Sequence, residues 1–111
     1  MTLQAAEVVL IPFPFTDLAA TKRRPVLVLR AEDPSGDFLA AAVTSQPGYS
    51  DAWQLNQEDF LEGRLPKTSW VRTTKLYTLN ASVVAHRFGR LTPPAFARVQ
   101  SAACTATGCK S

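Results

Sequence analysis

The sequence lacks the long apolar runs that mark membrane-spanning proteins. Its longest runs, such as residues 8–11 and 26–29, stop after about four residues, far short of the roughly 20 that span a bilayer. The N-terminus also lacks a positive region followed by an apolar stretch, which a secretory signal contains. We therefore expect a cytoplasmic protein with no membrane partner.

Cysteine and histidine are scarce, with two cysteines and one histidine in 111 residues. A single cysteine pair does not make the disulfide framework of a small secreted domain. Cys104 and Cys109 have no histidine near them in sequence, so they make a poor zinc site. We expect structurally incidental thiols, and neither a metal nor a cofactor in the function of the chain.

Acidic residues are absent from the chain after Gly63, which divides it into a first and a basic second half. All nine precede Gly63, whereas eight of the twelve lysines and arginines follow it. The positive electrostatic field of the basic half would attract a polyanion and speed its association. This asymmetry therefore favours nucleic acid as the partner. The alternative is that acidic loops fold back over the basic half and the charges only keep the protein in solution. Composition leaves both open.

The chain has enough apolar residues for one folded domain. Hydrophobic residues make up 46% of it and charged residues 19%, as in ordinary globular proteins. With 111 residues, we expect a single domain over residues 1–111 with an ordered core of about 5–103. The tail beyond this core is rich in Ala, Thr and Gly and is expected to fray.

Short strands separated by turn residues dominate the pattern. Thr92 fits a helix N-cap with Pro93 in the first turn, which predicts one short terminal helix. Many short strands with little helix favour a mainly β fold, built as a strongly curved antiparallel sheet or small barrel. We expect strands at residues 7–15, 25–30, 38–44, 69–72 and 82–90, a loop at 16–23 and one helical turn within 74–79.

Several ordered sequence blocks resemble a known family. They read VVLIPFPFTD at residues 8–17, KRRPVLVL at 22–29 and AVTSQ at 42–46, and the similarity continues through VRTTKLYTL at 71–79 and GRL at 89–91. Blocks in this order are more specific than any one of them. From Glu7 to about Val99, the chain resembles the PemK/MazF-like growth-inhibitor toxins.

The resemblance implies an SH3-like small barrel with short helices, the fold of CcdB- and MazF-type toxins. It also implies a homodimer that a cognate antitoxin protein neutralises. The implied activity is that of a metal-independent, sequence-selective endoribonuclease of a type II toxin-antitoxin system. Such an enzyme cleaves single-stranded messenger RNA and so inhibits translation and growth.

Cleaving RNA without a metal requires the 2′-hydroxyl to attack the neighbouring phosphorus. The protein must then position the backbone, move a proton and stabilise charge on the phosphoryl oxygens. A guanidinium suits the last task because it holds two phosphate oxygens at once and stays charged. By the resemblance, Arg24 beside the rigid Pro25 and Thr44 at a strand end are the catalytic residues. The expected RNA-binding residues are Lys22, Arg23, Ser45, Gln46, Arg72 and Lys75.

The chain departs from the family pattern after Arg72. Some relatives carry an aspartate two positions later, where this sequence has Thr74. A carboxylate proposed as general base in those relatives is therefore missing. Transfer of the 2′-hydroxyl proton would then fall to Thr44 with Arg24, to the substrate itself or to solvent. The chain could also be a weaker or altered nuclease.

We expect structural rather than functional roles for three further side chains. His86 has a pKa suited to proton transfer, but it lies away from the matched blocks, so we expect a structural residue. Phe13 and Phe15 could stack on bases, although such residues more often form core or dimer contacts. The basic end of residues 16–23 is the better candidate for touching RNA.

Two other functions stay open on the same barrel. A gyrase-binding toxin of the CcdB kind would do no chemistry, and the blocks around Arg24 and Thr44 argue against it. A non-catalytic nucleic-acid-binding module would need only the basic second half, and it predicts RNA retention that falls steeply with salt. The endoribonuclease is the function that the sequence favours.

Overall fold

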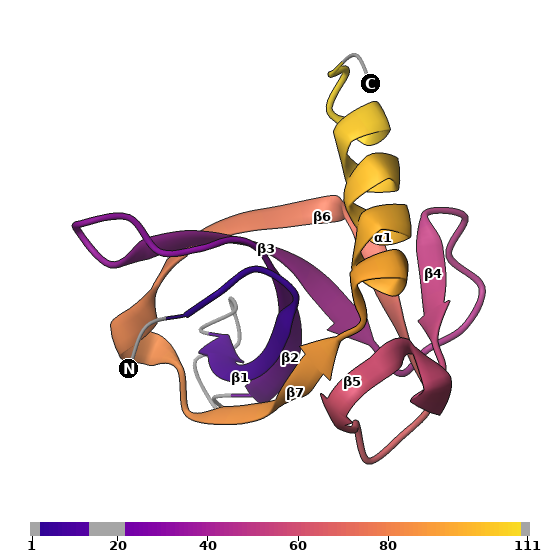
Figure 1. The fold of residues 1–111 in the computed structure, drawn as a ribbon, viewed down its shortest axis with the longest axis horizontal. Coiled ribbons are helices and arrows are strands. Elements are labelled where there is room, and N and C mark those ends of the chain that lie inside the picture. Colours follow the sequence, from indigo (N-terminus) through magenta and orange to yellow (C-terminus); the bar gives the residue numbers. More distant parts are fainter. Residues whose placement is uncertain (1–2, 14–21, 110–111) are drawn as a thin grey trace.

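A computed structural model describes residues 3–13 and 22–109 of the chain. They form a seven-stranded antiparallel sheet and a C-terminal α-helix, which confirms the mainly β prediction (Figure 1). Within these residues, no helix has the length and apolar character needed to cross a bilayer. The elements are β1 (Glu7–Phe13), β2 (Lys22–Arg30), β3 (Asp37–Thr44), β4 (Ala52–Leu55), η1 (Gln57–Asp59), β5 (Phe60–Gly63), β6 (Ser69–Asn80), η2 (Ala81–Val83), β7 (His86–Leu91) and α1 (Pro93–Ala106).

The sheet curls because its two edge strands follow one another in the chain. The strand order is β4-β6-β3-β2-β1-β7-β5, so β4 and β5 lie at opposite ends of the sheet. Only Asn56 and the 3₁₀-helix η1 (Gln57–Asp59) separate them in sequence. Because neighbouring strands lie about 4.8 Å apart, this link is too short to cross a flat sheet. The ends therefore bend toward one another and form a half-barrel (Figure 1).

Alternation along the strands divides the buried side chains into two cores on opposite faces of the sheet. In β2, Val26 and Val28 belong to one core, whereas Leu27 and Leu29 belong to the other. The second core is covered by the apolar stripe of α1, whose residues recur at helical spacing. The stripe consists of Ala95, Val99 and Ala103.

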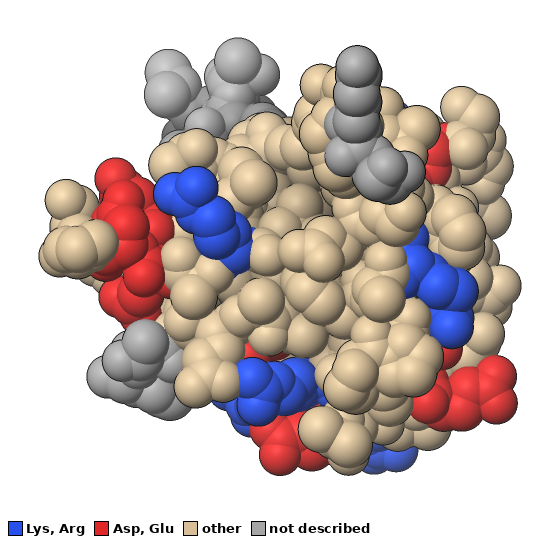
Figure 2. Space-filling model, turned by 45° about the horizontal axis from the view of Figure 1, so that its top comes forward, with Lys and Arg blue, Asp and Glu red and all other residues tan. Residues whose placement is uncertain are grey.

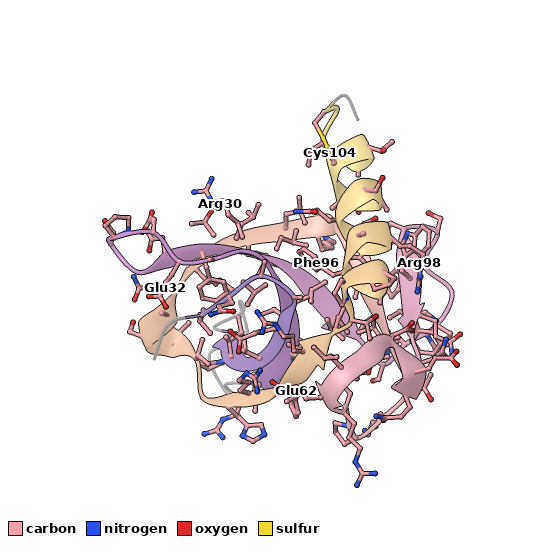
Figure 3. The ribbon with its side chains drawn as sticks, viewed as in Figure 1. Arg30, Glu32, Glu62, Phe96, Arg98 and Cys104 are labelled. Carbon is pink, nitrogen blue, oxygen red and sulfur yellow. A yellow bond between two sulfur atoms is a disulfide. The ribbon has the colours of Figure 1, made fainter. Side chains whose placement is uncertain are left out.

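The helix α1 begins where the sequence predicts. Thr92 is its N-cap, and the Thr92 hydroxyl accepts a hydrogen bond from the Ala95 backbone N–H at 3.3 Å. Pro93 occupies the first turn, where its missing N–H costs nothing. Arg98 projects from the helix and forms a 3.1 Å ion pair with Asp59 of η1, which ties α1 to the link between the sheet edges (Figure 3).

Several predictions of local structure are wrong or incomplete. The strand expected at residues 82–90 begins only at His86, after the 3₁₀-helix η2 (Ala81–Val83). Residues 74–79 are not a helical turn but part of the 12-residue strand β6, because β3 supplies hydrogen bonds that a local pattern cannot reveal. Lys22 and Arg23 begin β2 rather than ending a loop, since β1 extends beside them. The edge strands β4 and β5 were not predicted, because each is only four residues long. Residues 14–21 lie outside the described residues.

The expectation of incidental thiols at Cys104 and Cys109 is wrong. The two sulfurs form a disulfide between Cα atoms 5.2 Å apart, within the range of native bridges. The turn that ends α1 brings them together, because Gly108 adopts a φ of 85° and the Cys109 N–H donates to the Cys104 carbonyl at 2.9 Å. A reversal of the chain after the helix therefore pairs residues that sequence spacing alone leaves apart.

The core predicts a clear contrast between two leucine substitutions. Leu27 is 0% exposed, so Leu27→Ala should lower the free energy of unfolding by about 2 to 5 kcal/mol through lost burial and a cavity. Leu61 is 62% exposed, so Leu61→Ala should change it by less than about 0.5 kcal/mol. Urea denaturation followed by circular dichroism measures both. Equal losses would contradict this assignment of the core.

Candidate functional site

Arg24, Thr44 and Arg72 face the same side of the sheet on three adjacent strands. In the register of β2 and β3, Val26 pairs with Ala42, and continuing this register by two residues sets Arg24 level with Thr44. In β6, Arg72 pairs with the same Ala42. Because side chains alternate between faces, all three point to the side on which Val26 and Val28 are buried.

These side chains line a groove of about 350 Å³. A second groove of about 270 Å³ adjoins it and shares Arg24, Val43 and Ser45 with it. Arg23 lines only the second groove, and the side chain of Lys22 lies outside the described residues. The structure thus brings seven of the eight sequence-predicted site residues to two neighbouring grooves. The residues that line the first groove are Arg24, Ala42, Val43, Thr44, Ser45, Gln46, Tyr49, Arg72, Lys75 and Tyr77.

The guanidinium of Arg24 is available to bind an anion. Arg24 is exposed. Among the residues that the structure describes, none forms an ion pair or a side-chain hydrogen bond with its guanidinium. Pro25 follows it directly within β2, opposite Leu10 of β1, and its ring fixes the backbone φ there. The charge therefore stands at the junction of the two grooves on a rigid strand.

The hydroxyl of Thr44 is oriented by its neighbours in the chain. Thr44 ends β3, and its Oγ1 accepts a hydrogen bond from the backbone N–H of Gln46 at 3.1 Å. A threonine hydroxyl carries one proton of its own in addition to its acceptor positions. The Gln46 N–H occupies one acceptor position, and the hydroxyl keeps its own proton for a ligand in the groove that Thr44 lines.

A register jump in β6 delivers further side chains to the groove. Ala42 pairs with Arg72, but the next residue of β3, Ala41, pairs with Leu76, so residues 73–75 have no partner on β3. This bulge returns Tyr77 to the face that Arg72 occupies, where it packs beside the core of Val26 and Val28. The strand thereby contributes both residues, together with Lys75 of the bulge, to one groove.

The loop between β3 and β4 holds Arg72 in place. Arg72 Nε donates to Asp51 Oδ1 at 3.2 Å, and the Arg72 guanidinium lies 3.8 Å from the centre of the Tyr49 ring. Neither partner is predicted from the sequence, nor is Tyr77. The segment after Gln46 matches none of the blocks on which the resemblance rests, and no local pattern marks Asp51 as a partner of β6.

Hydrogen bonds keep the carboxyl of Asp51 ionised. Its side chain is only 11% exposed, and burial alone would raise its pKa. The Thr74 hydroxyl, the Thr74 backbone N–H and Arg72 all donate to it and outweigh burial, so the pKa of Asp51 lies below its ordinary value. The group is a fixed negative charge beside the groove.

Other candidates from the sequence lie elsewhere. His86 is exposed on β7 and stacks edge-on against Phe88, with ring centres 5.0 Å apart, and it lines neither groove. The side chain of Phe13 and the whole of Phe15 lie outside the described residues. Within the part of the chain that is described, no three His, Cys, Asp or Glu side chains gather as metal ligands. Metal independence stays a prediction.

Acids from the first half of the chain neutralise part of the basic second half. Arg87 pairs with Glu7 and Glu62, and Arg98 pairs with Asp59. On the face drawn in Figure 2, lysine and arginine side chains form separate patches with acids between and beside them. The alternative reading of the charge asymmetry thus holds for these arginines, which leaves Arg24 distinct from them.

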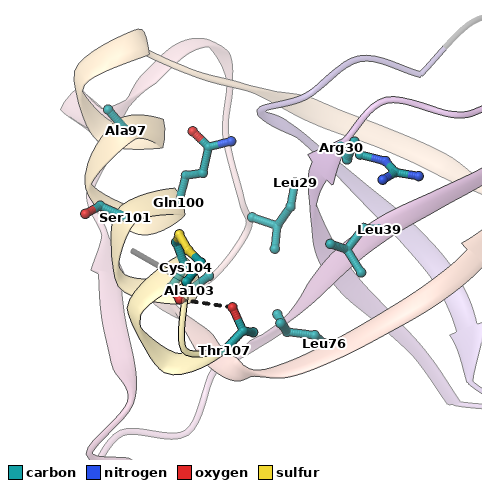
Figure 4. A pocket seen from close by; sticks show the side chains of 11 residues that line it. Leu29, Arg30, Leu39, Leu76, Ala97, Gln100, Ser101, Ala103, Cys104 and Thr107 are labelled. Carbon is teal, nitrogen blue, oxygen red and sulfur yellow. Dashed lines mark hydrogen bonds between the residues drawn. A yellow bond between two sulfur atoms is a disulfide. The ribbon is translucent and has the colours of Figure 1, made fainter. Parts of the chain in front are cut away.

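A larger apolar pocket lies away from the groove, between α1 and the sheet. Its volume is about 490 Å³, and Leu29, Leu39 and Leu76 face the helix across it (Figure 4). On the helix side it is lined by Ala97, Ala103 and both cysteines of the disulfide. Its apolar lining suits packing against another surface rather than binding a phosphate.

Comparisons with known proteins agree with this fold. A family model described as "PemK-like, MazF-like toxin of type II toxin-antitoxin system" matches residues 4–106. Among curated proteins, none matches the sequence of the chain. A MazE-MazF structure (Form-III) from Deinococcus radiodurans has a TM-score of 0.80 at 22% identity, covering 99% of this chain and 100% of its own. An endoribonuclease in complex with its cognate antitoxin from Mycobacterial species has a TM-score of 0.74 at 16% identity, with 98% of both chains covered. The Mycobacterium tuberculosis toxin MazF-mt6 has a TM-score of 0.71 at 16% identity, covering 95% of this chain and 99% of its own.

The lowered pKa of Asp51 predicts how stability depends on pH. A carboxyl whose pKa is lower in the folded than in the unfolded state stabilises the fold above the unfolded value, near 3.9, and this contribution is lost as the pH falls through the folded value. Asp51→Asn removes the titrating group, so the variant should be less stable at pH 7 and lose less on acidification from about pH 5 to 2. Urea titrations across this range measure the difference. Parallel curves for variant and wild type would contradict it.

Proposed function

The chain belongs to the PemK-like, MazF-like toxin family of type II toxin-antitoxin systems, and we propose that it is a metal-independent endoribonuclease that cleaves single-stranded RNA. One observation carries the proposal. The guanidinium of Arg24, which has no ion-pair partner among the described residues, converges with the Thr44 hydroxyl and the Arg72 guanidinium on one open groove. Two positive charges and a hydrogen-bond donor stabilise a phosphodiester while it gains negative charge.

In the proposed reaction the 2′-oxygen of a ribose bonds to the adjacent phosphorus, and the bond from phosphorus to the 5′-oxygen breaks. The 2′-hydroxyl gives up its proton and the leaving 5′-oxygen takes one up. The products are a 2′,3′-cyclic phosphate and a 5′-hydroxyl. Arg24 stabilises the developing charge on the non-bridging oxygens, since its planar fork contacts two of them at once. Arg72 binds the same phosphate from the opposite side of the groove.

Thr44 contributes a directed hydroxyl. Its Oγ1 accepts from the Gln46 N–H, and its own proton is available to donate to a phosphate oxygen or to the attacking 2′-oxygen. Ser45, Gln46 and Lys75 line the same groove and hold neighbouring parts of the strand. Arg23 extends this binding surface into the second groove, where it contacts the next phosphate.

The proposed partners follow from the family. A cognate antitoxin protein neutralises this toxin, and messenger RNA in the cytoplasm is its substrate. The chain forms a homodimer, in which the apolar pocket between α1 and the sheet packs against a second copy. An apolar surface with few charges is the kind of surface that dimer contacts bury.

Removing the central guanidinium should abolish most of the activity. We expect Arg24→Ala to lower the rate of cleavage about 100-fold or more, because one donor to the transition-state charge is lost. Purified protein is incubated with RNA and a chelator, without gyrase or DNA, and the RNA ends are mapped. Arg64→Ala is the matched control, because Arg64 is exposed and lines neither groove, and it should keep the wild-type rate.

The same assay separates the nuclease from the other functions. Cleavage in the chelator, with 2′,3′-cyclic phosphate ends, supports the proposal, whereas strict dependence on magnesium would overturn the mechanism. A non-catalytic binding module would retain RNA in a salt-dependent manner and leave it intact. A gyrase-binding toxin would do neither in the absence of gyrase.

A charge in the apolar pocket should disrupt the proposed dimer. Ala97 is exposed on α1 and lines this pocket, so Ala97→Glu should convert the dimer to a monomer by placing an unpaired charge in the contact. Thr105→Glu adds the same charge to an exposed position of α1 outside the pocket and should leave the dimer intact. Light scattering at micromolar concentration measures the mass. A monomeric wild type would contradict the homodimer.

A further inference from the structure

Five hydrogen bonds join Asp51 to strand β6. Its carboxylate accepts from Arg72 Nε at 3.2 Å, from the Thr74 N–H at 3.2 Å and from the Thr74 hydroxyl. Its backbone carbonyl accepts from the N–H of Thr73 at 3.1 Å and from the Thr73 hydroxyl at 3.0 Å. Three consecutive residues of one strand are thus bound to a single residue of the loop before β4.

These three residues lie at the start of the register jump of β6. Residues 73–75 have no partner on β3. Asp51 directly precedes β4 and continues the register in which Ala52 pairs with Arg72, so its carbonyl accepts from the Thr73 N–H. Its carboxylate accepts from the Thr74 N–H, which has no acceptor on β3. The bulge, and with it the position of Arg72 relative to β3, therefore depends on this loop residue.

Asp51 also fixes the orientation of the Arg72 side chain. It holds one edge of the guanidinium through Nε, while the ring of Tyr49 supports one face at 3.8 Å. Within the described residues, the two Nη atoms of Arg72 make no hydrogen bond. The free edge of a guanidinium held in this way carries the paired N–H groups that bind two phosphate oxygens.

Resting on the proposed nuclease function, we infer that Asp51 is a positioning residue of the RNA-cleavage groove, acting through Arg72 and the β6 bulge rather than on the substrate. Its carboxylate is nearly covered and is occupied by three donors. A general base works best when its pKa lies near the operating pH, whereas the pKa of Asp51 is lowered. Its role is therefore to present the second guanidinium to the phosphate in the correct geometry.

A double-mutant cycle tests this inference. Asp51→Asn should lower the kcat of RNA cleavage roughly 10-fold or more, with a change of less than about 3-fold in KM, because misplacement weakens the transition state more than ground-state binding. Arg72→Ala should lower it at least as much. The double variant should lose much less than the product of the two single losses, because Asp51 acts largely through Arg72. Glu58→Gln removes the charge of an exposed acid that lines neither groove and should leave kcat within about 2-fold of the wild type.

A relocated carboxylate gives a second readout. The Thr74 hydroxyl contacts Asp51 Oδ2, so Thr74→Asp in the Asp51→Asn background returns a negative charge to the same place and should restore part of kcat. In the wild-type background, Thr74→Asp places a second carboxylate beside that of Asp51, and their repulsion should slow the reaction. An aspartate at position 74 that acted as a general base would speed cleavage in both backgrounds, whereas a positioning charge speeds it only in the Asp51→Asn background. Thr74→Val removes one donor to Asp51 while sparing the carboxylate, and it should lower kcat about 3-fold even where Asp51→Asn folds poorly.

The outcomes are distinguishable. A wild type that leaves RNA intact would overturn the proposed nuclease and the inference with it. Wild-type cleavage combined with additive losses for Asp51→Asn and Arg72→Ala, or with no gain from the relocated carboxylate, would overturn the inference alone. Circular dichroism and thermal unfolding of each variant give the folded fraction by which kcat is corrected.

Discussion

The register jump in β6 is the constraint on which the groove depends. A regular β6 would place Thr74 where Tyr77 now lies opposite Ala40, and the strand would give the groove one fewer large side chain. An unpartnered stretch inside a sheet must still satisfy its backbone donors, and a loop residue, Asp51, does so. The same residue also orients Arg72. Asp51 therefore accepts hydrogen bonds from the backbone of the bulge and positions a functional charge at the same time.

The location of each charge matters more than the net charge of +3. Arg87 and Arg98 belong to the basic second half, but acids brought from the first half by the fold neutralise them. Arg24 has no such partner among the described residues, although it comes from the half that contains every acid. An anion that reaches the grooves therefore meets a charge whose field is not already compensated locally.

Much of the architecture could be predicted from the sequence because its causes are local. Alternating apolar residues identify β2 and β3, and the cap at Thr92 identifies the start of α1. The ordered blocks around Arg24 and Thr44 also led to residues that share one groove. The strands β4 and β5 were missed because each has four residues, and the helical turn within 74–79 was wrong because the bulge follows from pairing with β3.

The sequence by itself determined the family, the mainly β fold and most of the residues at the groove. These follow from short-range pattern and from the order of the matched blocks. Only the tertiary structure decided that Asp51 and Tyr49 hold Arg72, and that Cys104 bonds to Cys109. The physical reason is that such contacts depend on how the chain turns between its strands and after its helix, and a pattern along the chain carries no record of the distances that those turns create.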